Sequence, residues 1–193
     1  MKIGVLALQG DFAEHLAVLG RLEAEAVAVR LPQHLQDLQG LIIPGGESTT
    51  IVRLLDTFGL RQPILELARH APIFGTCAGM ILLARRATDL DRPTLGLIDI
   101  TVQRNAFGRQ VDSFEADLAF KGLPGKVHAV FIRAPIILQA EPAVDVLASL
   151  PDGTPVAARQ GNILVSAFHP ELTTDARVHA YFVEIAREHA RAS

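Results

Sequence analysis

The chain has 193 residues, of which 49% are hydrophobic, and its formal net charge is −3 without a long basic stretch. These values exclude intrinsic disorder, argue against a nucleic-acid-binding surface, and predict one domain over residues 1–193. The single cysteine cannot form an internal disulfide and no apolar run approaches membrane-spanning length, so we expect a cytoplasmic protein without membrane association.

The first half of the chain alternates short apolar runs with amphipathic segments. It predicts strands at 3–8, 27–31, 41–43 and 73–74, and helices at 11–23, from Ser48 onward, at 63–70 and at 80–86. The run at 3–8 is too short for a signal peptide and is better explained as a buried strand. Ser48 is the expected N-cap of its helix. Apolar strands that alternate with helices are typical of a parallel sheet covered on both faces.

The second half contains strand candidates with little helix between them. They lie at 97–102, 127–132, 144–147, 156–158 and 163–168, separated by turns rich in proline and glycine, and predict antiparallel additions to the same sheet. A final helix is expected from Thr174 to the tail, with Val178, Tyr181, Phe182 and Ile185 on one apolar face. These features predict an α/β fold with a central, largely parallel mixed sheet flanked by helices.

Cys77 lies in the pentad Gly75-Thr76-Cys77-Ala78-Gly79, between the expected strand at 73–74 and the helix at 80–86. This arrangement matches the G-x-S-x-G nucleophile elbow, with sulfur in place of oxygen. The glycines permit a tight turn, and the thiol would stand at a helix N-terminus, where the dipole favours the thiolate. The alternative is a buried, inert cysteine. The spacing favours a nucleophile.

His169 is the candidate base among seven histidines, because it follows the apolar strand at 163–168 and precedes Pro170 and Glu171. Residues i and i+2 of extended backbone point the same way, so Glu171 could orient one ring nitrogen and leave the other for Cys77. Pro170 restricts the backbone between them. The alternative is a strand-end histidine that only bonds a loop. The remaining histidines are assigned as follows: His15, His70, His179 and His189 on solvated helix surfaces, His34 in a polar loop and His128 near a strand start.

A third feature is the loop Pro44-Gly45-Gly46-Glu47-Ser48, which follows a strand and opens a helix. Ligand sites of parallel α/β sheets form at the carboxyl ends of strands, so N–H groups of this loop could bind an oxyanion together with that of Ala78. The alternative is a glycine turn followed by a serine cap. The loop lacks the lysine and spacing of a phosphate-binding loop, and no cluster has metal-ligand spacing, so we expect no metal.

The pentad at Cys77 and the triplet His169-Pro170-Glu171 together resemble the class I (triad) glutamine amidotransferase family, whose fold is flavodoxin-like. Further segments are similar to one branch of it, the glutaminase subunits of pyridoxal 5′-phosphate synthase. They are GVLALQGD at 4–11, PGGESTT at 44–50, RNAFGRQ at 104–110, SFE at 113–115 and FIRAP at 131–135. The similarity covers essentially the whole chain, and general amidotransferase domains lack the segment at 104–110.

The resemblance implies hydrolysis of L-glutamine by a Cys77–His169–Glu171 triad, without any cofactor in this chain. It implies that ammonia passes to a (β/α)8-barrel synthase partner, which builds pyridoxal 5′-phosphate. It also implies the remaining site residues: Gly46, Glu47 and Ser48 contact glutamine, the N–H groups of Gly46 and Ala78 form the oxyanion hole, and Arg104, Ile132 and Arg133 hold the amino-acid end. Without the resemblance, Arg104 and Arg133 are better explained as surface ion pairs.

Other functions remain open at this stage. An amidotransferase subunit of histidine or tryptophan synthesis would share the triad but not the segment at 104–110. A cysteine peptidase or thiol-stress protein could use the same scaffold, and activity on peptides rather than free glutamine would identify it. A non-catalytic subunit would be expected to lack a triad member, whereas this chain has all three.

Overall fold

The computed structural model describes residues 1–106 and 113–192. Its central element is a seven-stranded sheet with the strand order β10-β11-β12-β4-β3-β1-β2. In that order the strands span Asp145–Ser149, Pro155–Gln160, Ile163–Ser166, Ile73–Thr76, Gly40–Ile43, Lys2–Leu6 and Glu25–Val29. Residues 107–110 of the expected segment at 104–110 lie outside the described residues.

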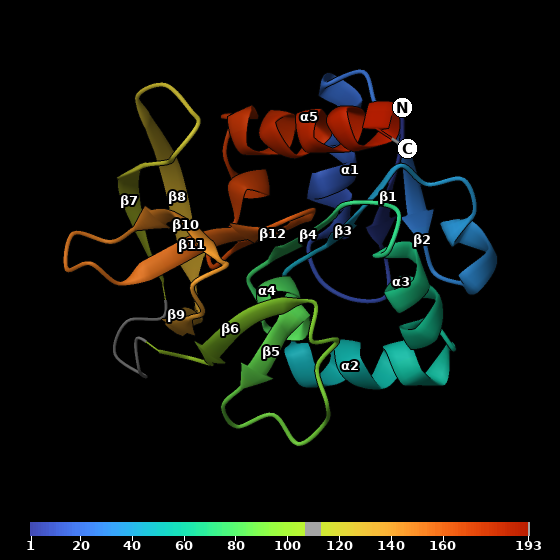
Figure 1. Ribbon diagram of the computed structural model, residues 1–193, viewed down its shortest axis with the longest axis horizontal. Coiled ribbons are helices and arrows are strands. Elements are labelled where there is room, and N and C mark those ends of the chain that lie inside the picture. The colour runs from blue at the N-terminus through green and yellow to red at the C-terminus, as the bar shows by residue number, and fades with distance from the viewer. Residues whose placement is uncertain (107–112, 193) are drawn as a thin grey trace.

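The five strands β12, β4, β3, β1 and β2 run parallel to one another. Strands β3, β4 and β12 are buried along their whole length, because their consecutive apolar residues face helices on both sides. Helices α1 (Phe12–Arg21) and α5 (Arg177–Ala192) cover one face, and α2 (Ser48–Thr57), α3 (Arg61–Leu67) and α4 (Ala78–Leu83) cover the other (Figure 1). This architecture confirms the expected α/β fold with a central, largely parallel mixed sheet flanked by helices.

The second half of the chain only partly follows expectation. Strands β10 and β11 extend the central sheet with antiparallel pairing. Two other expected additions to that sheet are wrong: β6 (Ile98–Gln103) forms a three-stranded sheet with β5 (Ala84–Ala87) and β9 (Ile136–Ala140), and β8 (Lys126–Ile132) forms a two-stranded sheet with β7 (Ser113–Ala119). Burial alternates along β6 and β8, which is typical of strands with one face against the core and the other toward solvent.

The helix expected at 80–86 is shorter than predicted, because it ends at Leu83. Ala84 adopts extended backbone and begins β5. The carbonyls of Leu82 and Leu83 instead accept hydrogen bonds from the amides of Leu95 and Leu97, at 2.7 and 2.8 Å. These bonds satisfy carbonyls that a helix end would otherwise leave unpaired.

The C-terminal helix α5 begins at Arg177, three residues later than predicted, and buries Val178, Phe182 and Ile185 as expected. Tyr181 is only partly buried. Among the described residues, no helix combines the length and the apolar content needed to cross a bilayer. Because β1, β3, β4 and β12 are parallel, their carboxyl ends lie at one edge of the sheet, and the segments that leave this edge carry the predicted site residues.

Candidate active site

The nucleophile elbow forms directly after β4. Cys77 has φ 48° and ψ −105°, a conformation that L-residues rarely adopt. A Cβ atom at Gly79 would lie 1.9 Å from the carbonyl oxygen of Ile43, so glycine is required where the elbow passes β3. The backbone amide of Cys77 donates to the carbonyl of Ser166 at 2.8 Å, which fixes the elbow against β12. Strain at a nucleophile that is held from both sides is a common property of active sites.

His169 and Glu171 follow β12 and are in contact, as expected. The extended backbone from which this contact was predicted is wrong, because Pro170–Leu172 form a 3₁₀ turn. Nδ1 of His169 lies 2.7 Å from Oε1 of Glu171, and the two residues are 3% and 5% exposed. Among the described residues, Nε2 of His169 is buried without a hydrogen-bond partner. The thiol of Cys77 instead donates to the carbonyl of Ile132 at 3.8 Å. One ring nitrogen of His169 is therefore oriented by a carboxylate while the other remains available.

Electrostatics stabilise the charged forms of this pair. Burial acts to lower the pKa of His169, but the neighbouring Cys77 and Glu171 outweigh burial and raise that pKa to about 10. Burial acts to raise the pKa of Glu171, but the neighbouring His15 and His169 bring it well below the usual range. An imidazolium between a thiolate and a carboxylate is the arrangement that activates a cysteine nucleophile.

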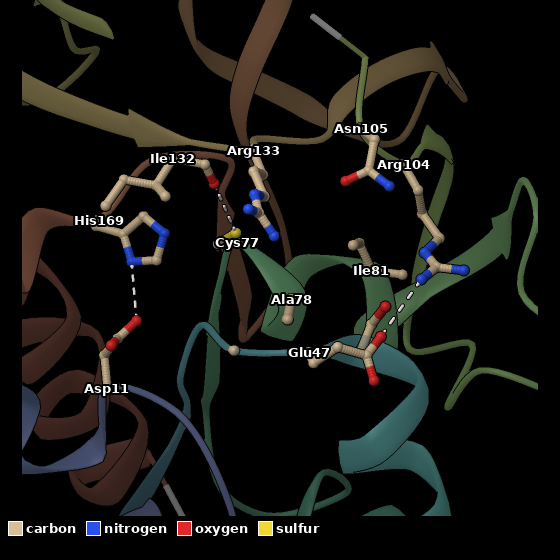
Figure 2. Close-up of a pocket in the computed structure, with 12 residues that line it drawn as sticks. Asp11, Glu47, Cys77, Ala78, Ile81, Arg104, Asn105, Ile132, Arg133 and His169 are labelled. Carbon is tan, nitrogen blue, oxygen red and sulfur yellow. Dashed lines mark hydrogen bonds and ion pairs between the residues drawn. The ribbon is translucent and has the colours of Figure 1, made fainter. Parts of the chain in front are cut away.

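Asp11 is a second carboxylate beside the imidazole. Its Oδ2 lies 3.4 Å from Nδ1 of His169 (Figure 2). Partial burial is the main reason that the pKa of Asp11 is raised. Ligand atoms of Asp11, His169 and Glu171 lie within 4.8 Å of one another, a cluster that the spacing in the sequence does not predict. Because Nδ1 of His169 already donates to Glu171, we interpret the cluster as an oriented imidazole rather than a metal site.

Two histidines contradict the sequence-based expectation of solvated helix surfaces. His15 of α1 and His179 of α5 are both 0% exposed. Their helices cover the same face of the sheet, and Nδ1 of His15 lies 2.8 Å from Nε2 of His179. Nε2 of His15 lies 3.2 Å from Oγ1 of Thr76 and 3.4 Å from Oε2 of Glu171. The buried imidazole of His15 thus lies directly behind the His169–Glu171 pair.

The glycine loop after β3 forms the opposite wall of the site. Gly46 has φ 149°, and a Cβ atom there would lie 2.5 Å from Oε1 of Gln9. The same Gln9 oxygen accepts a hydrogen bond from the amide of Glu47 at 2.8 Å. The expectation that Ser48 caps α2 is wrong, because the cap is Glu47, whose carboxylate accepts bonds from the amides of Thr49 and Thr50. A carboxylate reaches two free amides at once, whereas a hydroxyl reaches one.

Arg104 lies across the pocket from Cys77. Its Nη2 is 3.3 Å from Oγ1 of Thr49 and 3.6 Å from Oε1 of Glu47, and its Nη1 donates to the carbonyl of Asp89. Its side chain is only 16% exposed. Arg104 therefore forms an ion pair, as the alternative from sequence expected, but this ion pair with Glu47 lines the cavity.

The predicted residues surround one cavity of about 380 Å³ (Figure 2). Its lining consists of Asp11, Gly46, Glu47, Ser48, Cys77, Ala78, Ile81, Arg104, Asn105, Ile132, Arg133 and His169. Glu171 is absent from the lining because it lies behind His169. Asp11, Ile81 and Asn105 were given no role from sequence. The signal for Asp11 was its position after β1, at the same sheet edge as Cys77.

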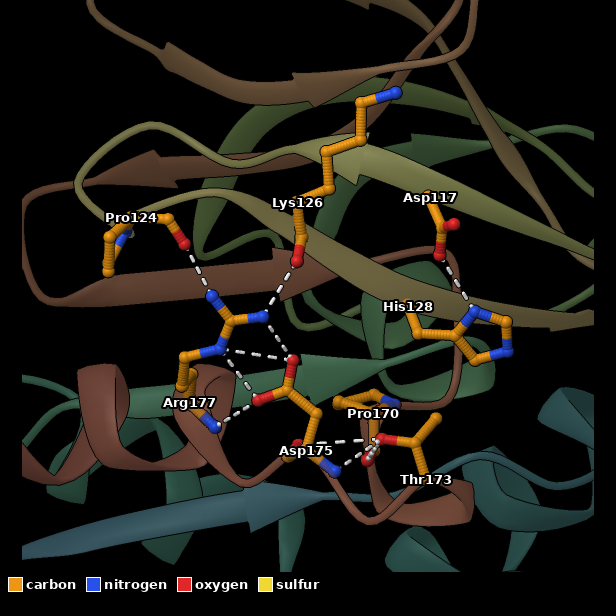
Figure 3. Close-up of polar contacts among 8 residues, drawn as sticks. All are labelled: Asp117, Pro124, Lys126, His128, Pro170, Thr173, Asp175 and Arg177. Atoms are coloured by element: carbon orange, nitrogen blue, oxygen red, sulfur yellow. Dashed lines mark hydrogen bonds and ion pairs between the residues drawn. The ribbon is translucent and has the colours of Figure 1, made fainter.

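The segment that follows Glu171 is anchored by a second set of polar contacts (Figure 3). Oγ1 of Thr173 donates to the carbonyl of Pro170 at 3.2 Å and accepts from the amide of Asp175 at 3.2 Å. The guanidinium of Arg177 binds the Asp175 carboxylate and donates to the carbonyl of Lys126 at 2.6 Å. These contacts attach the segment to β8. The carbonyl of Val130 in β8 also accepts a hydrogen bond from the amide of His169.

Comparisons with known proteins agree with this geometry. The profile of the SNO glutamine amidotransferase family matches residues 5–188. The chain is 58% identical to a pyridoxal 5′-phosphate synthase subunit PdxT of Dehalococcoides mccartyi, over 98% of this chain and 99% of the relative. It is 53% identical to the PdxT subunit of Geobacillus kaustophilus, over 100% and 98%. A crystal structure described as glutamine amidotransferase superposes with a TM-score of 0.91 at 50% identity, covering 95% of this chain and 98% of that one.

Proposed function

Because this chain belongs to the SNO glutamine amidotransferase family, we propose that it is the glutaminase subunit of a pyridoxal 5′-phosphate synthase. Relatives that are 58% and 53% identical over 99% and 98% of their own length carry that name. The observation that carries the proposal is the meeting of Cys77, His169 and Glu171 beside a cavity that also contains a glycine loop and two arginines.

The reaction begins with Cys77 and His169. The thiol proton passes to Nε2 of His169, and Sγ then attacks the side-chain amide carbon of L-glutamine as a thiolate. Glu171 holds the imidazole through Nδ1 and stabilises the imidazolium, and it keeps its own negative charge. His169 then gives its proton to the departing nitrogen, so ammonia leaves and a γ-glutamyl thioester remains. Water, deprotonated by His169, hydrolyses the thioester and releases glutamate and the thiol.

The tetrahedral intermediate carries an oxyanion that needs hydrogen-bond donors. The amide of Ala78 is suited to this role, because the first amides of a helix have no acceptor within the helix. The amide of Gly46 is the second proposed donor. Gly46 has φ 149°, and because glycine lacks a side chain, its peptide can rotate toward the substrate. We assign completion of the hole to the docking of the synthase partner.

The remaining lining residues are assigned to recognition of the substrate. The guanidinium groups of Arg104 and Arg133 suit the α-carboxylate of glutamine, and the Glu47 carboxylate suits its α-ammonium group. Hydrogen bonds from Thr50 and Thr49 outweigh partial desolvation and lower the pKa of Glu47, so it is negatively charged at neutral pH. Ser48 and the backbone of Ile132 complete the proposed pocket.

We further propose that the ammonia passes to a (β/α)8-barrel synthase subunit and that this chain needs no cofactor. We also propose that residues 1–193 form one glutaminase domain, since in the described part of the chain a buried apolar cluster extends from Ile3 to Ile185. We place the protein in the cytoplasm, because its nucleophilic thiol must stay reduced.

A glutaminase assay with and without the synthase subunit tests the proposal. We expect slow release of glutamate by the chain alone and faster release with the partner, with peptides left intact. Cleavage of peptides in preference to free glutamine would support the peptidase alternative. Stimulation by a subunit of histidine or tryptophan synthesis would support the other amidotransferase assignments.

A further inference from the structure

Glu171 has one carboxylate oxygen that the triad does not use. Oε1 is bound by His169 at 2.7 Å, whereas Oε2 is buried and has no hydrogen bond among the described residues. The charged form of a buried carboxylate requires partners on both oxygens to offset its loss of hydration. The group that faces Oε2 is Nε2 of His15, at 3.4 Å.

The surroundings of His15 determine which of its nitrogens carries the proton. A lone pair on Nε2 would face the Glu171 carboxylate and be repelled by it, so Nε2 carries the hydrogen, directed between Oε2 and Oγ1 of Thr76. Nδ1 of His15 is then an acceptor, and its neighbour at 2.8 Å, Nε2 of His179, must donate. Nδ1 of His179 is left as a lone pair, which agrees with its burial without a hydrogen-bond partner among the described residues.

The pKa shifts of the two neighbours are consistent with this assignment. Burial lowers the pKa of His179 to about 3, so His179 is neutral and can donate from one nitrogen only. The proximity of His15 also lowers the pKa of Glu171, as expected for an Nε2–H directed at its carboxylate.

We propose that His15 is a positioning residue of the triad: its Nε2–H fixes the second oxygen of Glu171, and His179 fixes the tautomer of His15. The catalytic unit then extends from Cys77 through His169 and Glu171 to two buried histidines on α1 and α5. Neither His15 nor His179 lines the cavity, so both act on the reaction only through Glu171. This inference rests on the proposed glutaminase function for its kinetic readout alone.

Variants of His15 that differ in one hydrogen-bond donor test the proposal. The amide nitrogen of His15→Gln can occupy the place of Nε2, whereas that of His15→Asn reaches only the place of Nδ1, and His15→Leu has no donor. With the synthase subunit present, we expect His15→Leu and His15→Asn to lower kcat by roughly ten- to a hundredfold, the effect of leaving one buried charged acceptor unpaired. KM should stay unchanged, and His15→Gln should recover most of kcat. Equal kcat in His15→Gln and His15→Leu would overturn the proposal.

Two measurements on the full chain do not depend on glutamine. Long-range ¹H–¹⁵N correlation spectra of the histidine-labelled wild-type protein, assigned with His15→Gln, should show the Nε2–H tautomer at His15. The Nδ1–H tautomer would contradict the proposal even if every variant failed to fold.

Alkylation of Cys77 by iodoacetamide should be slower in His15→Leu than in His15→Gln, and equal rates would count against the role of His15. A wild-type protein with these spectra but without glutaminase activity would refute the proposed function and leave the role of His15 standing.

Discussion

The backbone amide of Cys77 donates to the carbonyl of Ser166 across 2.8 Å, so the hydrogen bonding between β4 and β12 continues as far as the nucleophile. His169 lies three residues beyond Ser166, the last residue of the neighbouring strand. Two parallel strands that are paired to their ends therefore bring together groups that are far apart in sequence. The position of the nucleophile relative to its base is set by sheet register rather than by flexible loops.

Substitution of the nucleophile is the first prediction. We expect Cys77→Ser to abolish glutamine hydrolysis while leaving the fold intact, because a hydroxyl ionises far less than a thiol and is nearly isosteric with it. Glutamate release and circular dichroism check the two halves of this statement. A glutamine-analogue electrophile should add its mass to Cys77 in the wild-type protein. Substantial turnover by the serine variant would rule out Cys77 as the nucleophile.

The two other triad members should differ in their effect. His169→Asn should be as damaging as loss of Cys77, because no other described imidazole lines the cavity and triad members act as a unit. Glu171→Gln should retain part of the activity, since an amide can still orient the ring but stabilises an imidazolium poorly. Single-turnover measurements of thioester formation compare the two. Near-normal activity of His169→Asn would require another base.

Arg104 offers a prediction on substrate affinity. Loss of a charge-assisted contact to the substrate carboxylate should raise KM for glutamine roughly ten- to a hundredfold in Arg104→Ala, with a smaller effect on kcat. Arg85→Ala is the matched control, because Arg85 is an exposed arginine that pairs with Asp99 outside the cavity. An unchanged KM in Arg104→Ala would exclude Arg104 from substrate binding.

Much of the site follows from sequence because its signals are local. The elbow at Cys77 depends on neighbouring small residues, and His169 and Glu171 are only two residues apart, so both features are visible without a fold. The 3₁₀ turn that joins His169 to Glu171 was not predicted. The apolar strands β3, β4 and β12 are equally clear, since parallel strands buried on both faces consist of consecutive apolar residues.

The missed features depend on tertiary packing. His15 and His179 are buried because α1 and α5 cover the same face of the sheet, a relation between helices that are more than 150 residues apart. Their charged sequence neighbours suggested solvent exposure. Strand β7 alternates polar and apolar residues and is mostly exposed, so no apolar run marks it. The short helix α4 ends where carbonyls find partners in the later segment at Leu95 and Leu97, which no local pattern encodes.

The raised pKa of His169 predicts how stability changes with pH. Because this pKa rises on folding from 6.5 to about 10, its contribution to the free energy of unfolding is fully present below pH 6.5 and is lost as the pH rises toward 10. Urea unfolding between these limits, under reducing conditions, should show a larger loss of stability in the wild-type protein than in His169→Asn. The same pH dependence in both proteins would show that His169 does not carry the shifted proton.

The last prediction concerns coupling to the synthase subunit. Gly46 has φ 149°, and a Cβ atom there would lie 2.5 Å from Oε1 of Gln9, so Gly46→Ala should hinder rotation of its amide toward the substrate oxygen. One oxyanion donor is worth about 2.7–4 kcal/mol, or roughly a hundred- to a thousandfold in rate. We therefore expect the partner to raise kcat of the wild-type chain by this order, and Gly46→Ala to lose most of that rise with little change in KM.

Gly59→Ala is the matched control for this coupling. Gly59 also has a positive φ, of 63°, but a Cβ atom there meets no atom within 4 Å. Gly59→Ala therefore introduces a similar backbone strain at a position that does not line the cavity. Its activity with the partner should match that of the wild-type protein. Equal turnover of the wild-type chain with and without the synthase subunit, at saturating glutamine, would show that the oxyanion hole is already formed. Full stimulation of Gly46→Ala would show that the second donor lies elsewhere, because the partner would then act without the Gly46 amide.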